Sequence, residues 1–431
     1  MKSKLLTKLL LLLPFVELFS AYSFFNIGDF SITPAVLLAC IIFVIMLIMF
    51  FLNKLLLTKK SLIVYLLFII ALISSVITNI NIGVGFKSAA LYTFFATFYL
   101  LIFNMKHVLF DTSRYIKKYL YFLTALSVLG IIQFLLQFTS IGYIDFVIDG
   151  FMKPGFNTTN ILTFNGLSFY RAHSIYAEPS FFSLYSAIGI IISFCLYKTK
   201  RLTGFETGFF VIINFIGILF SVAGSGLLLL CAFFLFYLIR NAIKNKRIWG
   251  LFSFVVISIS CFMILSLSSD AFRVLFSERL LEIFHPNTSG FVRFVLPYYM
   301  GVVSVFRNPF GCGPSNTQLV NNLTGLDMPY FNNIIGDVNS SYGKALIELG
   351  YIGLIIFCMI CVYLYKHSND LTSKSFAVIF IIQGFLGGNL LDFGSLSLVS
   401  LCLLLSTRKE KIVVENGCYN NIVNVEKIGV R

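Results

Sequence analysis

Apolar residues fill long unbroken runs of this sequence, and polar residues gather between the runs. Runs of about 17 to 22 residues match the length that an α-helix needs to cross the hydrocarbon core of a bilayer. We therefore expect an all-α polytopic membrane protein with about twelve transmembrane helices. The predicted spans lie near residues 5–22, 34–53, 62–79, 88–105, 119–140, 180–197, 205–221, 224–240, 248–267, 345–365, 375–390 and 393–407.

Two connections between the spans are much longer than the others, at about 141–178 and 268–343. Connections longer than about 15 residues usually carry function. We expect one transmembrane helical domain over residues 1–407, with these two segments as extended extracytoplasmic loops. A polar cytoplasmic tail is expected at residues 408–431.

Composition and charge agree with this pattern. The chain is 58% hydrophobic and only 12% charged, about half the charged share of a soluble protein. If the N-terminus is cytoplasmic, 24 of the 32 Lys and Arg residues lie on the inner side. Because basic residues accumulate in cytoplasmic loops, both termini are predicted to be cytoplasmic. The net charge of +14 then follows from topology and predicts no nucleic-acid partner.

Cysteine and acidic residues show no pattern typical of a metal site. Cys312 is the one cysteine of nine in an outer segment, which excludes a disulfide framework there. Cys358 and Cys361 have CxxC spacing, but they lie in an apolar run without nearby His or acidic residues. We predict neither a metal nor another cofactor.

The strongest local signal lies at residues 168–182, before the sixth predicted span. Pro179 fits the first turn of a helix and keeps Glu178 extended, which predicts Glu178 at the outer helix cap. A carboxylate at that position is also favoured by the helix dipole, which is a purely structural role. In a second interpretation, Arg171 binds a phosphate and Glu178 orients Arg171 or accepts a proton. Both interpretations remain open at this point.

Residues 171–182 resemble the RxxSxxxEPSxF stretch of bacterial O-antigen and exopolysaccharide polymerases. Three later segments resemble other landmarks of the O-antigen polymerase and ligase superfamily: residues 221–226 its small-residue SxSG turn, Arg293 with residues 308–313 its R…NPxGxG stretch, and residues 339–342 with 348–353 its HNxY…ExGxxG entry into a span. The landmarks occur in the expected order over about 168–355. In the SxSG turn, the missing side chains allow neighbouring helices to approach closely.

The resemblance implies glycosyl transfer between polyprenyl-pyrophosphate-linked glycans at the outer face of the bacterial inner membrane, by a fold like the multispan lipid-dependent glycosyltransferases. Such a reaction needs groups that stabilise charge on phosphate oxygens and one that accepts a proton. Candidates for the catalytic roles are Glu178 as base, and Arg171 and Arg293 on the pyrophosphate. Candidates for substrate binding are His173, Ser174, Arg273, Arg279, Arg307, Asn339 and Ser340. His173 is also the second candidate base.

Membrane lipid, a chain-length-regulating co-polymerase and a flippase are the partners that the resemblance implies. A ligase, which transfers finished glycan, is one alternative. The ligases are expected to carry His where this chain has Asn339, and an amide is no general base, which favours a polymerase. A flippase of the same lipid is the other alternative. It needs no outer segment of this length and more often places charges inside spans, where Glu17 is among the few acidic residues.

Further residues have plain structural interpretations beside the chemical ones. Gly311 and Gly313 predict a turn, although their backbone N–H groups also suit a phosphate. Glu348 lies four residues after Lys344, which predicts an ion pair on one helix face. Arg293 suits an ion pair with an acidic residue of its own loop as well as a phosphate.

Overall fold

The structure is a computed structural model. It describes residues 2–27, 30–77, 82–105, 112–146, 151–152, 161–164, 167–245, 281, 284–285, 288–315, 340–387 and 391–406. Within these ranges the chain is mostly helical. The helices are α1 (Lys2–Glu17), α2 (Pro34–Phe51), α3 (Lys59–Ile77), α4 (Ile82–Phe103), α5 (Thr112–Leu136), α6 (Pro179–Lys198), α7 (Gly204–Ser221), α8 (Gly224–Asn245), α12 (Ser289–Phe294), α13 (Leu296–Arg307), α15 (Ser341–His367), α16 (Leu371–Leu386) and α17 (Phe393–Ser406).

Seven helices of the described part of the chain are long and apolar enough to cross a membrane. They are α2, α3, α5, α6, α7, α8 and α15. Helices α4, α16 and α17 contain shorter apolar stretches. The chain is therefore a helical membrane protein.

The predicted spans agree with the helices wherever the two can be compared. Each predicted span overlaps one helix, except 248–267, which lies outside the described residues, as does the tail at 408–431. The first span was predicted over 5–22, but α1 ends at Glu17 and the next residues form turns. Glu17 therefore lies at a helix end, whereas the sequence predicted it well inside a span.

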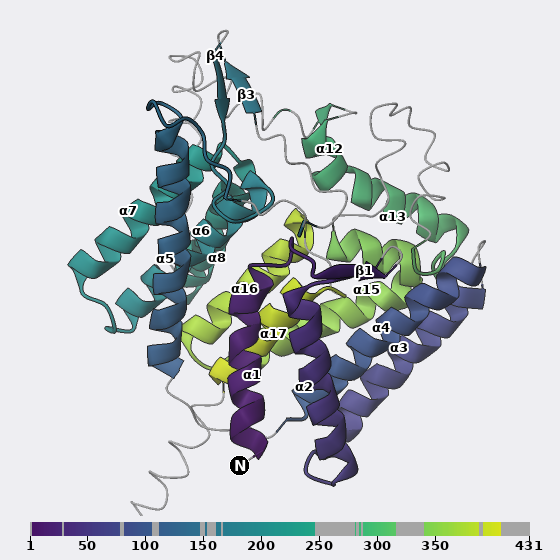
Figure 1. Ribbon diagram of the computed structural model, residues 1–431. Coiled ribbons are helices and arrows are strands. Elements are labelled where there is room, and N and C mark those ends of the chain that lie inside the picture. Colours follow the sequence, from purple (N-terminus) through teal and green to yellow (C-terminus); the bar gives the residue numbers. More distant parts are fainter. Residues whose placement is uncertain are drawn as a thin grey trace, which may run out of the picture.

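The helices form a bundle around one continuous apolar core (Figure 1). On one side α6 contacts α5, α7 and α8, and on the other α15 contacts α3, α16 and α17. Helix α16 joins the two sides because it packs against α6 and α8 as well as α15. Bulky side chains such as Phe95, Phe182, Phe357 and Phe376 are almost fully buried in this core.

The first long outer segment contains a β-hairpin. Strand β3 (Ile161–Phe164) pairs antiparallel with β4 (Leu167–Tyr170), and the hairpin extends from the bundle beyond the end of α5 (Figure 1). A second hairpin, β1 (Phe25–Ile27) with β2 (Phe30–Ile32), connects α1 to α2. The isolated bridge between Tyr22 and Met152 joins the connection between α1 and α2 to the connection between α5 and α6.

The second long outer segment was predicted to be a loop, and it contains helices α12 and α13. Leu296 and Met300 of α13 are buried together with Cys312 and Ile347, so α13 packs on the first half of α15. Apolar residues of the segment are thus used to build a small satellite core. The prediction of an extended loop is wrong for this stretch, because we counted only runs long enough to cross a membrane.

The junction between α7 and α8 confirms the close approach predicted for its small residues. Val222 adopts a left-handed conformation that ends α7. A Cβ atom at Gly226 would collide with the carbonyl of Ser183, so only glycine lets α8 lie this close to α6. Ser225 Oγ donates to the Ser180 carbonyl at 2.7 Å. The junction therefore supports the first turn of α6, directly after Glu178.

Candidate functional site

The loop 171–178 links β4 to α6, and its last residue caps the helix as predicted. Glu178 is extended, with φ −133° and ψ 143°, and Pro179 occupies the first turn of α6. The Glu178 side chain makes no capping hydrogen bond to the helix backbone. Its Oε2 accepts a hydrogen bond from Ser180 Oγ at 3.0 Å. The carboxylate is thus held at the end of a membrane helix and is partly exposed.

Gln133 of α5 holds the middle of this loop. Its Oε1 accepts hydrogen bonds from the backbone N–H groups of both His173 and Ser174, at 2.9 and 2.8 Å. Its Nε2 donates to the carbonyl of Ile144 at 3.2 Å. The Gln133 side chain is fully buried. One carboxamide therefore joins a membrane helix to two stretches of the first outer segment.

His173 is buried among polar groups from the same segment. Its Nε2 lies 2.7 Å from the Tyr143 hydroxyl, 3.3 Å from Gln133 Nε2 and 3.5 Å from Asp145 Oδ1. Burial lowers the pKa of His173, because the charged imidazolium is harder to desolvate, while Asp145 opposes this shift. Arg171 lowers the same pKa further, which shows that the two cationic groups are near each other.

His173 Nδ1 and Ser174 Oγ are buried polar atoms of this loop that have no hydrogen-bond partner among the described residues. Ser174 also has a positive φ of 56°, a conformation unusual for a residue with a side chain. Buried polar groups are nearly always hydrogen-bonded, so orphaned ones point to a functional role. We name Gln133, Tyr143, Asp145, His173 and Ser174 the His173 cluster.

Arg171 precedes this cluster at the end of β4. Its side chain is partly exposed, and Arg171 interacts with neighbouring groups of the protein. Within eight residues the loop thus presents a guanidinium, an imidazole and a carboxylate at the end of α6. Of the predicted site residues, Arg171, His173 and Ser174 lie near one another, and Glu178 lies at the other end of the same loop.

The other predicted site residues lie elsewhere. Arg307 is exposed in the last turn of α13. Ser340 is fully buried and caps α15, where its Oγ accepts a hydrogen bond from the Gly343 N–H at 3.2 Å. The side chain of Arg293 lies outside the described residues, as do Arg273, Arg279 and Asn339.

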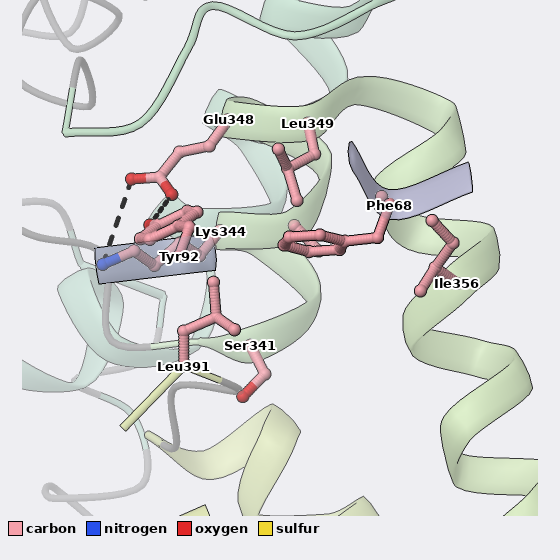
Figure 2. A pocket seen from close by; sticks show the side chains of 10 residues that line it. Phe68, Tyr92, Ser341, Lys344, Glu348, Leu349, Ile356 and Leu391 are labelled. Atoms are coloured by element: carbon pink, nitrogen blue, oxygen red, sulfur yellow. Dashed lines mark hydrogen bonds and ion pairs between the residues drawn. The ribbon is translucent and has the colours of Figure 1, made fainter. Parts of the chain in front are cut away.

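A second polar cluster lies on α15. Lys344 Nζ is 3.9 Å from Glu348 Oε1, so the predicted ion pair is confirmed. The Glu348 carboxylate also accepts hydrogen bonds from the Tyr92 hydroxyl of α4 and, at 3.0 Å, from the Ser315 N–H. Figure 2 shows the side chains of Glu348, Lys344 and Tyr92 turned toward one another at one side of a narrow pocket, with Phe68 and Ile356 on the other. We name Tyr92, Ser315, Lys344 and Glu348 the Glu348 cluster.

The Glu348 cluster lies beside a break in α15. Gly350 has φ 65° and ψ −155°, and a Cβ atom there would collide with the Pro309 carbonyl. The break frees backbone groups that residues 309–313 then pair: Cys312 N–H donates to the Ile347 carbonyl at 2.9 Å and Gly313 N–H to that of Glu348 at 3.1 Å. Two of the predicted landmarks thus pack directly against each other.

These pairings decide between the two interpretations of Gly311 and Gly313. Both residues have positive φ, at 90° and 86°, as the predicted turn requires. Their N–H groups donate to the carbonyls of Asn308 and Glu348. The hypothesis that these N–H groups bind a phosphate is therefore wrong, because protein acceptors already occupy them.

Sequence inspection did not single out Gln133, Tyr143 or Tyr92. Gln133 of α5 and Gln137, directly after its end, lie four residues apart in an otherwise apolar stretch, a spacing typical of one helix face. That pair was an available signal, because polar residues inside a span need a partner. The described residues contain no group of three or more His, Cys, Asp or Glu side chains that could hold a metal ion.

Comparison with known proteins gives no independent assignment. No protein-family model matches the chain, and no curated protein is significantly similar to it.

Proposed function

We propose that this protein polymerises polyprenyl-pyrophosphate-linked oligosaccharide repeat units into a surface polysaccharide, at the outer face of the bacterial inner membrane. Twelve spans with both termini in the cytoplasm place loop 171–178 on that outer face, and the distribution of Lys and Arg supports this topology. The order of the landmarks over residues 168–355 supports the reaction class.

One observation carries the proposal: Arg171, His173 and Glu178 gather in a short loop that Gln133 fixes at the end of a membrane helix. A lipid-linked substrate has its pyrophosphate at the membrane surface and its sugars outside, so a site at a helix end meets the reacting bond. Holding reactive groups in one geometry is the main contribution that such a site makes to the rate.

The chemistry assigns a role to each group. The acceptor hydroxyl oxygen attacks the anomeric carbon of the donor sugar, and the bond from that carbon to the pyrophosphate oxygen breaks. Arg171 stabilises the negative charge that grows on the departing pyrophosphate, since a guanidinium pairs with phosphate oxygens in two parallel hydrogen bonds. Glu178, partly exposed at the cap of α6, accepts the hydroxyl proton.

Arg293, Arg273 and Arg279 remain proposed contacts to the donor or glycan. Arg307 is a weaker candidate, because it is exposed at the end of α13. Membrane lipid, a co-polymerase and a flippase remain proposed partners.

The experiment compares surface glycan in cells that carry wild-type protein, Arg171→Ala, Arg171→Lys or Glu178→Gln. Arg240→Ala serves as the control, because it removes an exposed arginine of α8 that has no proposed role, and expression is verified for each variant. We expect glycan to collapse to single lipid-linked repeat units at the outer leaflet in the Arg171 and Glu178 variants. Polymer length in the Arg240→Ala control should change little.

The other outcomes assign the alternatives. Long lipid-linked polymer that accumulates without transfer to its final acceptor would identify a ligase. Single units that stay on the cytoplasmic side would identify a flippase and overturn the enzymatic proposal.

A further inference from the structure

The carboxamide of Gln133 has only one orientation that satisfies its neighbours. Oε1 faces two backbone N–H groups, those of His173 and Ser174, which only an oxygen can accept. The NH₂ group must then point to the Ile144 carbonyl and to the ring of His173. The backbone therefore fixes which end of the amide meets the imidazole.

This orientation determines the form of His173. Gln133 Nε2 is a donor at 3.3 Å from His173 Nε2, whereas the Tyr143 hydroxyl at 2.7 Å can either donate to that atom or accept from it. An imidazole nitrogen that faces an amide donor carries its lone pair, so the proton of the neutral ring lies on Nδ1 and the Tyr143 hydroxyl is then a second donor to Nε2. A charged ring would place an N–H group against the N–H of Gln133.

We propose that Gln133 is the positioning residue of this site: it holds His173 neutral, with the lone pair on Nε2, and so keeps loop 171–178 in its working shape. The proposal rests on the function proposed above and adds the residue that controls it. Gln133 acts through His173 and the loop backbone and needs no contact with substrate.

One acidic and one basic neighbour act on the His173 ring. Asp145 Oδ1 lies 3.5 Å from His173 Nε2 and favours the charged imidazolium, whereas Arg171 opposes it. Tyr143 stacks on Tyr170, with ring centroids 4.2 Å apart, which holds its hydroxyl in place. When the ring gains a proton in acid, Nε2–H faces the Gln133 N–H group as well as Asp145, so the contact between Gln133 and the ring becomes unfavourable.

Gln137, directly after the end of α5, provides a matched control. It lies one turn beyond Gln133 and holds the same connection in a similar way, because its Oε1 accepts from the Tyr170 N–H at 2.8 Å and its Nε2 donates to the Tyr170 carbonyl at 3.0 Å. Gln137 does not contact His173 in any described hydrogen bond. Gln133→Glu and Gln137→Glu therefore add the same charge with and without contact to the imidazole.

The test measures the pKa of His173 directly, by the pH dependence of deuterium exchange at the imidazole C2 position, followed by mass spectrometry. The chain has four histidines, so His173 can be observed in its own peptide. Gln133→Glu keeps an acceptor for both backbone N–H groups but replaces the donor to Nε2 by a carboxylate. We expect it to raise the pKa of His173 by about one unit or more, since a carboxylate next to an imidazole favours its charged form. The acid limb of glycan polymerisation should move to higher pH by the same amount.

Gln137→Glu should leave both the pKa and the acid limb almost unchanged. An equal shift in the two variants, or no shift in Gln133→Glu, would overturn the proposal. If Gln133→Glu does not fold, Tyr143→Phe decides instead, because it removes the other donor to Nε2 and should raise the same pKa by a smaller amount.

The two readouts separate this inference from the proposed function. A shifted pKa together with normal polymer in Arg171→Ala would leave the role of Gln133 intact and remove the polymerase. Loss of polymer in Arg171→Ala together with an unshifted His173 pKa in Gln133→Glu would support the polymerase and overturn the role of Gln133.

Discussion

The His173 cluster and the Glu348 cluster both tie an outer segment to a buried part of a membrane helix, but they do so with different chemistry. Glu348 is about 1% exposed, and its carboxylate meets a cation, a hydroxyl and a backbone N–H group. The His173 cluster is held by a neutral amide and leaves His173 Nδ1 and Ser174 Oγ without partners among the described residues. A fully paired cluster stabilises structure, whereas an incompletely paired one has capacity for a ligand or a proton.

The largest effect on the free energy of unfolding should come from breaking the Glu348 cluster. Glu348→Leu leaves Lys344, only 8% exposed, without its carboxylate, and removing one partner of a buried pair costs about 3–5 kcal/mol. Unfolding of the purified protein in detergent, followed against denaturant, measures this loss. Glu206→Gln, at an exposed helix cap, is the control and should cost about 1 kcal/mol or less.

The double variant Lys344→Met/Glu348→Leu sharpens the result. It removes both charges and should recover part of the lost stability, because no unpaired charge stays buried. If Glu348→Leu alone costs less than the Glu206→Gln control, the Glu348 cluster is not what holds residues 308–315 against α15.

Substitutions in the His173 cluster should destabilise the protein less than those in the Glu348 cluster. Gln133→Leu removes the acceptor of two backbone N–H groups, and an unsatisfied buried donor costs about 1–3 kcal/mol. Gln137→Leu removes equivalent bonds at an exposed position, where water replaces them, and should cost about 1 kcal/mol or less. The same denaturant experiment compares the two variants. Equal losses would mean that Gln133 is not specifically required by the loop.

The sequence predicted the helices better than the contacts between them. Long apolar runs, the cap at Glu178 and the pair Lys344–Glu348 are local features, determined by residues within one helix or one turn. The hydrogen bonds of Gln133 to His173 and of Tyr92 to Glu348 join residues 40 and 256 positions apart. No periodicity encodes such pairs, because they depend on how whole helices pack.

Candidate residues were predicted well where a motif was compact and poorly where it was dispersed. Residues 171–178 form one short loop, which Gln133 holds at the end of α6, so a single motif locates all of its candidate residues. Ser340, a predicted substrate contact, is fully buried as a helix cap, a role that its position before α15 already allowed.

The smallest effect concerns pH. The folded protein lowers the pKa of His173 below the value of about 6.5 that an unfolded chain gives it, chiefly by burial and despite Asp145. The unfolded chain therefore binds more protons in the window just below pH 6.5. The free energy of unfolding must then fall with falling pH there, by at most about 1.4 kcal/mol per pH unit, and it must be constant above that window as far as this group is concerned.

Unfolding measured between pH 5 and 8 in wild type and in His173→Gln isolates this contribution. The difference between the two proteins should change only in the acid part of the range, and His285→Gln, at an exposed position, should follow wild type. A His173→Gln variant that loses stability in acid as steeply as wild type would mean that another group titrates. Since Arg171 and Asp145 act on His173 in opposite directions, Asp145→Asn should steepen the loss, because it removes the one acidic neighbour that favours the charged ring.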